Sequence, residues 1–183
     1  MGVAAGKVFM ATQNAHLVAL DATTGRPVWT KVFGDVRAGG SATLAPLVVK
    51  DLVVVGTSGA EHGLLGHIDA FDIKTGRRVW RRYNIPEPGE PGSETWPQED
   101  EGWTRGGGSA WITGSYDPEL DLMYWGTGNS SPDFDGSVRP GDNLRVKLLT
   151  ATRDGEHSGA EVLCRHLCAL QQDAGSDDHA VDP

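Results

Sequence analysis

The chain has 183 residues, a net charge of −9 at pH 7 and two cysteines. This length allows one domain with a sizeable core, and the negative charge argues against nucleic acid or an anionic membrane surface as a partner. No apolar run reaches the roughly 18 residues that a membrane span requires. The N-terminus lacks the features of a signal peptide, and two cysteines are too few for a disulfide framework.

Short β-strands joined by turns are predicted over most of the chain. We expect strands over 7–11, 17–20 and 28–33, then over 46–49, 52–57, 67–71 and 79–83, and finally over 110–116 and 120–125. Residues 84–108 are rich in Pro, Gly and acidic side chains, and we expect them to form a long loop that covers a site. The 25 glycines, 10 prolines and 6 tryptophans are typical of an all-β repeat protein.

An eleven-residue phrase occurs twice, as ALDATTGRPVW at 19–29 and as AFDIKTGRRVW at 70–80, which gives a period of 51 residues. In each copy the aspartate can accept backbone N–H bonds at the start of a turn, and the glycine supplies the positive φ. Trp29 and Trp80 are then free to pack on a neighbouring unit. Four strands in roughly 50 residues describe a propeller blade, whereas the alternative, a β-solenoid, has a shorter repeat.

The last forty residues differ in character. No aromatic residue follows position 134, strand alternation disappears, and a third copy of the phrase, expected soon after Asn143, is missing. We therefore divide the chain into a propeller segment, 1–144, and a divergent tail, 145–183, which is either disordered or the product of a frameshift near Asn143. Residues 161–172 predict a short amphipathic helix. Cys164, His166 and Cys168 suggest zinc, but no second ligand pair at finger spacing accompanies them.

Several polar and aromatic side chains occur where predicted strands end. Glu61 follows an apolar strand between glycines, and Asn129 follows Gly-Thr-Gly at the end of another strand. Carboxylate and amide oxygens of this kind bind hard cations, although a solvated loop glutamate and a turn asparagine are the alternative interpretations. Trp111, eighteen residues before Asn129, offers a flat surface for stacking or for packing between blades.

Four motifs carry a family resemblance: TLAPLVVKDLVVVGTSGAEHG at 43–63, YDP at 116–118, YWGTGN at 124–129 and RPGDNL at 139–144. With them the chain resembles the pyrroloquinoline-quinone (PQQ)-dependent alcohol dehydrogenases of the methanol/ethanol type over about residues 2–144. The resemblance implies an all-β fold of about three consecutive blades from an eight-bladed propeller. It implies that Glu61 and Asn129 bind calcium, with a lanthanide left open, and that Thr43, Ser58 and Trp111 bind PQQ.

The resemblance also implies an activity. Members of the family are periplasmic oxidoreductases that oxidise primary alcohols to aldehydes by hydride transfer to a calcium-bound quinone, and they pass electrons to cytochrome c. The family's general base, an aspartate, would fall where the divergent tail stands. Its cysteine pair would precede Met1, and its arginine would stand at about the position of Met1. We therefore expect a segment of such an enzyme that is inactive alone. The alternatives are a quinone-binding sensor and a non-catalytic propeller scaffold for protein partners, which needs none of Glu61, Trp111 and Asn129.

Overall fold

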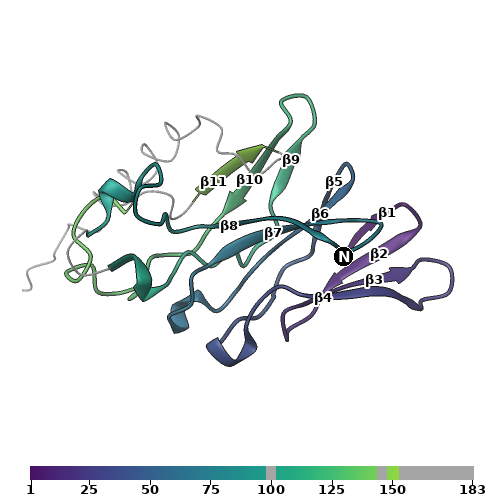
Figure 1. Cartoon of the computed structure of the whole chain (residues 1–183), viewed down its shortest axis with the longest axis horizontal. Coiled ribbons are helices and arrows are strands. Elements are labelled where there is room, and N and C mark those ends of the chain that lie inside the picture. The colour runs from purple at the N-terminus through teal and green to yellow at the C-terminus, as the bar shows by residue number, and fades with distance from the viewer. Residues whose placement is uncertain (98–101, 144–147, 153–183) are drawn as a thin grey trace, which may run out of the picture.

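The computed structural model describes residues 1–97, 102–143 and 148–152, and they form three antiparallel sheets (Figure 1). The first sheet contains β1 (Gly2–Ala4), β2 (Lys7–Ala11), β3 (His16–Asp21) and β4 (Pro27–Val32). The second contains β5 (Leu47–Val49), β6 (Leu52–Gly56), β7 (His67–Asp72) and β8 (Arg78–Tyr83). The third contains β9 (Ser115–Asp117), β10 (Leu122–Gly126) and β11 (Leu148–Thr152), in the order β11-β10-β9.

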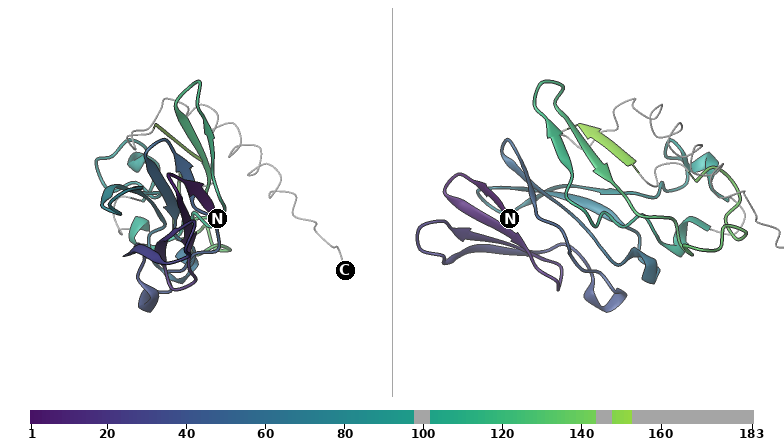
Figure 2. Two further views of the ribbon diagram at one scale, coloured as in Figure 1. Left: turned by 90° about the vertical axis from the view of Figure 1, so that its right-hand side faces the viewer. Right: turned by 180° about the vertical axis from the view of Figure 1, so that it is seen from behind.

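Each four-stranded sheet is a simple meander, because its strands pair in chain order. This is the topology of a propeller blade, and the three sheets follow one another across the molecule in the order of the sequence (Figure 2). The inner strands of adjacent sheets lie close together, since a Cβ added at Gly2 of β1 would sit 2.9 Å from the carbonyl oxygen of Pro46, next to β5. The predicted all-β class is confirmed, and the number of blades in the whole propeller stays a prediction.

The two copies of the eleven-residue phrase adopt the same conformation. Asp21 accepts hydrogen bonds from the backbone N–H groups of Thr23 and Thr24, at 3.1 and 2.7 Å, and Asp72 accepts the equivalent pair at 3.0 and 2.7 Å. The register shifts once in each copy, between Ala19 and Leu20 and between Ala70 and Phe71. The repeat therefore specifies the turn and the bulge as well as the strands.

Trp29 joins the first sheet to the second. Its indole Nε1–H donates to the carbonyl of Ile73 at 3.4 Å, and its ring lies over Gly76, where an added Cβ would be 2.7 Å from the ring atom Cδ2. The residue is half-buried in β4, whose other side chains are exposed. The predicted packing of Trp29 on the neighbouring unit is confirmed, and Gly76 permits it because it carries no side chain.

The main core lies between the sheets, with β6 at its centre. All five residues of β6 are buried, because sheet neighbours flank the strand and other segments cover both of its faces. Phe9, Leu17 and Phe71 pack into the same cluster from the first two sheets, and Trp125 packs into it from the third. This continuous core holds the ends of β6 and β10, where Glu61 and Asn129 follow, at fixed positions.

Two predicted segments differ from the structure. Residues 110–116 were expected to be one strand, but β9 begins only at Ser115, because the preceding residues bond to loops: Ala110 N–H donates to Thr57 O at 2.8 Å. The loop over 84–108 contains two short 3-10 helices, η3 (Ser93–Thr95) and η4 (Gly102–Arg105), and has its own small core of Ile85 and Trp96 packed against Leu65 and Trp103. Strand β1 was not predicted, since three residues are too few to show alternation.

The predicted tail lies mostly outside the described residues. These include the expected helix at 161–172 and the cysteines and histidine considered for zinc. Strand β11 lies beyond the predicted boundary at 144 and pairs with β10 over five residues, from Leu122–Thr152 to Gly126–Leu148. The boundary itself stays a prediction.

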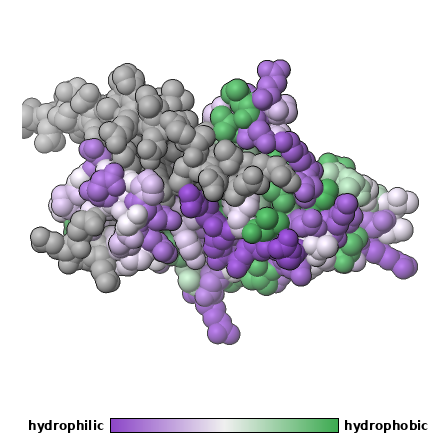
Figure 3. Space-filling view, turned by 45° about the horizontal axis from the view of Figure 1, so that its top comes forward, coloured by the Kyte–Doolittle hydropathy of each residue, from purple (hydrophilic) through white to green (hydrophobic). Residues whose placement is uncertain are grey.

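The surface of the described part is mixed in character. Figure 3 shows small, separate hydrophobic areas among hydrophilic side chains on the face in view. Among the residues that the structure describes, no helix is long and apolar enough to cross a membrane.

Candidate functional site

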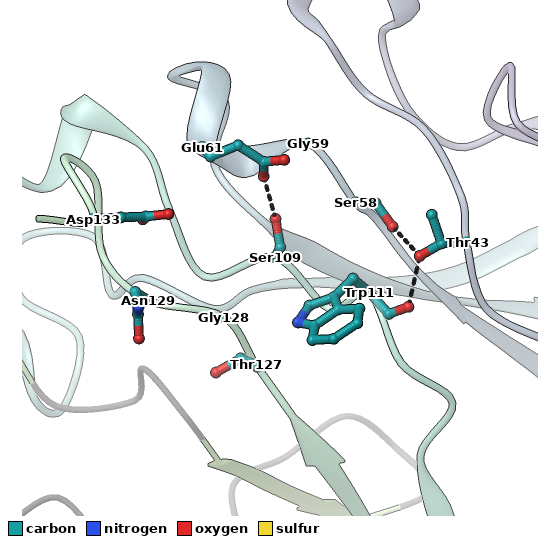
Figure 4. Close-up of a pocket in the computed structure, with 10 residues that line it drawn as sticks. All are labelled: Thr43, Ser58, Gly59, Glu61, Ser109, Trp111, Thr127, Gly128, Asn129 and Asp133. Atoms are coloured by element: carbon teal, nitrogen blue, oxygen red, sulfur yellow. Dashed lines mark hydrogen bonds between the residues drawn. The ribbon is translucent and has the colours of Figure 1, made fainter. Parts of the chain in front are cut away.

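The five residues predicted to bind cofactor or metal line one cavity (Figure 4). They come from separate parts of the chain: Thr43 before β5, Ser58 and Glu61 after β6, Trp111 before β9, and Asn129 after β10. The cavity has a volume of about 480 Å³, within the range that small-molecule sites occupy. The fold thus brings together residues up to 86 positions apart, from Thr43 to Asn129.

Glu61 lies in the short 3-10 helix η2 (Ala60–His62), which begins four residues after β6 ends. Gly59 and Gly63 flank η2 with φ of 93° and 94°, values that favour glycine. The buried hydroxyl of Ser109 donates a hydrogen bond to Glu61 Oε2 at 3.2 Å, and the rest of the Glu61 side chain is exposed to the cavity. The carboxylate is therefore anchored at one oxygen and accessible at the other.

A chain of hydroxyl groups fixes the opposite wall. Thr43 Oγ1–H donates to the carbonyl of Trp111 at 2.7 Å, which uses its proton, so Ser58 Oγ–H donates to Thr43 Oγ1 at 2.9 Å. Trp111 is 52% exposed, and its indole lies in the cavity (Figure 4). A half-exposed tryptophan with a fixed backbone provides a ready surface for a flat aromatic ligand.

Asn129 is held by its backbone. Its carbonyl accepts from Gly108 N–H at 2.7 Å, and Gly128 N–H donates to Ser109 O at 2.7 Å. In Figure 4 the amide of Asn129 is directed away from the carboxylate of Glu61, although both residues line the cavity. Among the described residues no three His, Cys, Asp or Glu side chains form a metal-binding group. A cation here would therefore need neutral oxygens and oxygens of a bound ligand in addition to the carboxylate of Glu61.

Sequence reasoning missed three lining residues, Ser109, Thr127 and Asp133, together with the segment that supports them. Gly106, Gly107 and Gly108 have φ of 90°, 106° and 69°, and Gly107 N–H donates to Ala60 O at 3.1 Å. A Cβ at Gly107 would lie 2.7 Å from Asn129 O. This glycine strap, residues 106–108, thus runs between the Glu61 and Asn129 loops. The run GGGS at 106–109 is the sequence signal for this segment, and its glycines fall within the predicted covering loop.

A second cavity, of about 440 Å³, lies between the first two sheets, and Arg81 on its wall pairs with the buried Asp69. Arg81 donates to both carboxylate oxygens of Asp69 at 2.7 Å and to Phe33 O at 2.7 Å. His67 Nε2 lies 2.8 Å from the same carbonyl, and burial lowers the pKa of His67 below 6.5. These contacts tie β7 and β8 to the end of β4, and we regard the cluster as structural.

Comparison with known proteins identifies the family. Residues 2–154 match the PQQ family described as "Glucose/ethanol/alcohol dehydrogenase, beta-propeller domain". The chain belongs to this family. It is 42% identical, over 84% of its length, to the lanthanide-dependent methanol dehydrogenase of Methylacidiphilum fumariolicum (strain SolV), of which it covers 28%. It is 41% identical, over 74% of its length, to methanol dehydrogenase [cytochrome c] subunit 1 of Paracoccus denitrificans, of which it covers 24%.

The fold supports the same assignment. A solved structure of a europium-containing methanol dehydrogenase superposes with a TM-score of 0.74 at 40% identity, over 84% of this chain and 30% of that chain. The predicted membership in the PQQ-dependent alcohol dehydrogenases, an oxidoreductase family, is confirmed. This chain spans about a quarter of the length of the relatives that it matches.

Proposed function

We propose that this chain forms part of the cofactor site of a PQQ-dependent alcohol dehydrogenase. In this proposal Trp111 stacks on PQQ, Thr43 and Ser58 hydrogen-bond it, and Glu61 and Asn129 bind a cation beside it. The observation that carries the proposal is the convergence of these five residues on one cavity. The substrate is a small primary alcohol.

The chemistry of the cavity fits the two groups. PQQ is a flat aromatic quinone with carboxylates, and the cavity offers the exposed face of Trp111 and two hydroxyl groups. Glu61 and Asn129 supply the carboxylate and amide oxygens that calcium and lanthanide ions prefer. Bound PQQ would accept a hydride equivalent from the alcohol, and a cation beside it would make the quinone more electrophilic.

Glu61 and Asn129 alone make a poor cation shell, since their side chains are directed differently at the site. Quinone oxygens would complete the shell, so each ligand creates part of the site for the other. By thermodynamic linkage, the cation must then raise the affinity for PQQ by the same factor as PQQ raises the affinity for the cation. The residues of this chain would bind, orient and stack the cofactor.

Two further parts of the proposal come from named relatives. The methanol dehydrogenase [cytochrome c] subunit 1 of Paracoccus denitrificans suggests that cytochrome c is the electron acceptor. The same similarity suggests a periplasmic location. The relatives named as lanthanide-dependent and europium-containing make a lanthanide an alternative to calcium.

A titration of the whole chain with PQQ tests the proposal. Tryptophan fluorescence should fall as PQQ stacks on Trp111, and half-saturation should need less PQQ when Ca²⁺ or La³⁺ is present. Trp111→Leu should remove most of the quenching, whereas Trp29→Leu, at the contact between sheets, should retain the cation-dependent binding. Absence of PQQ binding with either cation would overturn the proposal and would favour the scaffold alternative.

A further inference from the structure

Asn84 is fully buried at the point where β8 ends and the long loop begins. Strand β8 ends at Tyr83, and the next residue, Asn84, is 0% exposed. Its side-chain Nδ2 donates a hydrogen bond to the carbonyl of Gly108 at 2.6 Å, 24 positions later. This bond closes the loop over 84–108 at its base, because it joins the first residue of the loop to the last.

The backbone of Asn84 is bonded at the same place. Its N–H donates to Gly66 O at 2.8 Å, and Gly66 N–H donates to Gly107 O at 2.9 Å. The packing is close, since a Cβ added at Gly66 would overlap Gly108 O and one added at Gly108 would lie 3.0 Å from Asn84 Cβ. Asn84 therefore holds the glycine strap against Gly66 with both its backbone and its side chain.

The glycine strap in turn holds the loop that contains Asn129. Gly108 N–H donates to Asn129 O at 2.7 Å, and Ser131 N–H donates to Gly106 O at 3.1 Å. The strap glycines in these bonds have left-handed φ, 69° at Gly108 and 90° at Gly106. A shift of the strap would therefore move the backbone of Asn129, and with it the amide on the cavity wall.

Burial makes the bond from Asn84 hard to replace. A buried carbonyl that loses its donor bears the cost of its own desolvation, and at this depth water does not take the place of the amide. The other end of the same amide, Asn84 Oδ1, is buried and has no hydrogen-bond partner in the part of the chain that the structure describes. An apolar side chain would avoid that cost, so the benefit of asparagine here lies in the bond to Gly108.

Glu61 depends less on the strap than Asn129 does. It lies in η2, which is closed by a backbone bond of its own, from Gly63 N–H to Ala60 O at 3.1 Å. Loss of the Asn84 side chain should therefore act mainly on Asn129.

We propose that Asn84 is a positioning residue of the cation site, which fixes, through the glycine strap, the backbone from which Asn129 reaches the metal ion. This inference rests on the proposed function, because Asn129 must bind the cation for its position to matter. Asn84 does not line the cavity, so it acts through the strap and touches neither the cation nor PQQ.

Hydrogen exchange measured by NMR tests the first step without any cofactor. In the whole chain, Asn84→Ala should raise the exchange rate of the Gly108 N–H about tenfold, because the strap loses a buried hydrogen bond. Asn143→Ala is the matched control: Asn143 is 8% exposed, and its Nδ2 donates to another loop carbonyl, Thr95 O, at 3.4 Å. It should leave the Gly108 rate unchanged. An unchanged rate in Asn84→Ala would overturn the inference.

A cation titration tests the second step. At fixed PQQ, the Ca²⁺ concentration for half-maximal quenching of tryptophan fluorescence should rise about threefold or more in Asn84→Ala. A group bonded directly to a metal ligand typically changes metal affinity by about 10- to 100-fold, and Asn84 acts at one remove. Asn143→Ala should need no more Ca²⁺ than the wild type. If Asn84 only stabilised the fold, its loss would lower the melting temperature and leave the Ca²⁺ requirement unchanged, which would overturn the inference.

A double-mutant cycle shows which ligand Asn84 acts through. Asn84→Ala should add little to the Ca²⁺ requirement of Asn129→Ala, because the side chain that it positions is gone, and should keep its full effect beside Glu61→Gln. A full effect beside Asn129→Ala would overturn the inference. If Asn84→Ala does not fold, Asn84→Leu, which has a similar volume and no donor, takes its place.

The outcomes also separate this inference from the proposed function. A wild-type chain that takes up no PQQ at any cation concentration overturns both. A wild-type chain that binds PQQ with a cation, and whose Asn84→Ala variant needs no more of that cation, overturns only the role of Asn84.

Discussion

Replacement of Gly76 by alanine tests how the first two sheets are joined. Gly76 has a φ of 68°, and its added Cβ would lie 2.7 Å from Trp29 Cδ2. A left-handed φ costs about 1–2 kcal/mol in a residue with a Cβ, and overpacking against a fixed side chain costs about 1–3 kcal/mol more. We expect Gly76→Ala to lower the free energy of unfolding by about 2–5 kcal/mol.

Gly25, the equivalent residue of the other copy, is a matched control. Its φ is 70°, and no atom lies within 4 Å of an added Cβ. Gly25→Ala should therefore lose only the backbone contribution, about 1–2 kcal/mol. Urea denaturation of the whole chain, followed by circular dichroism, measures both values. Equal losses of unfolding free energy in Gly76→Ala and Gly25→Ala would refute the packing of Trp29 on Gly76. The difference between the two losses should also shrink when Trp29 is replaced by leucine, and an unchanged difference would refute the packing as well.

Three further predictions concern charged groups. Burial lowers the pKa of His67 below 6.5, so the contribution of His67 to stability is complete above about pH 6.5 and declines as the pH falls. His67→Gln should therefore make the melting temperature depend less on pH between about pH 5 and 7. The backbone N–H and hydroxyl of Thr75 lower the pKa of Asp72 below 3.8, so Thr75→Val should raise it in an NMR titration, and an unchanged value would contradict this. Asp133→Asn should raise the Ca²⁺ requirement for PQQ uptake a few-fold, roughly as expected for loss of a nearby carboxylate. Asp135→Asn should leave the Ca²⁺ requirement unchanged, because Asp135 does not line the cavity and accepts hydrogen bonds from Ser137. Equal effects of the two substitutions would show that only the net charge of the protein matters, which would contradict a role for Asp133 at the site.

The sequence predicts best what depends on local chemistry. The turns at Asp21 and Asp72 follow from neighbouring residues, and both form with the expected hydrogen bonds. The position of Trp29 follows from the same phrase, because the turn and bulge determine which way the strand presents its indole. Convergence of Glu61, Trp111 and Asn129 on one cavity was expected from family resemblance, since no local pattern relates residues on different strands.

The features that the sequence did not reveal depend on close approach between distant segments. The glycine strap is needed because its backbone passes between two loops, a constraint that appears only when both loops are in place. Ser109 hydrogen-bonds to Ala60 and Glu61, which lie 48 or more positions earlier in the chain. Residues 110–114 look like a strand by composition, but Thr57 O accepts the N–H of Ala110 and Thr43 Oγ1 donates to the carbonyl of Trp111.

The central claim is that one cavity of this chain binds PQQ, stacked on Trp111, with a cation beside the quinone. A crystal structure of the whole chain grown with PQQ and a lanthanide tests it most directly, because the ion gives an anomalous signal of its own. The account predicts one strong anomalous peak at coordination distance from Glu61 and the Asn129 amide, with the quinone stacked on Trp111. A peak elsewhere, or quinone density away from Trp111, would contradict it.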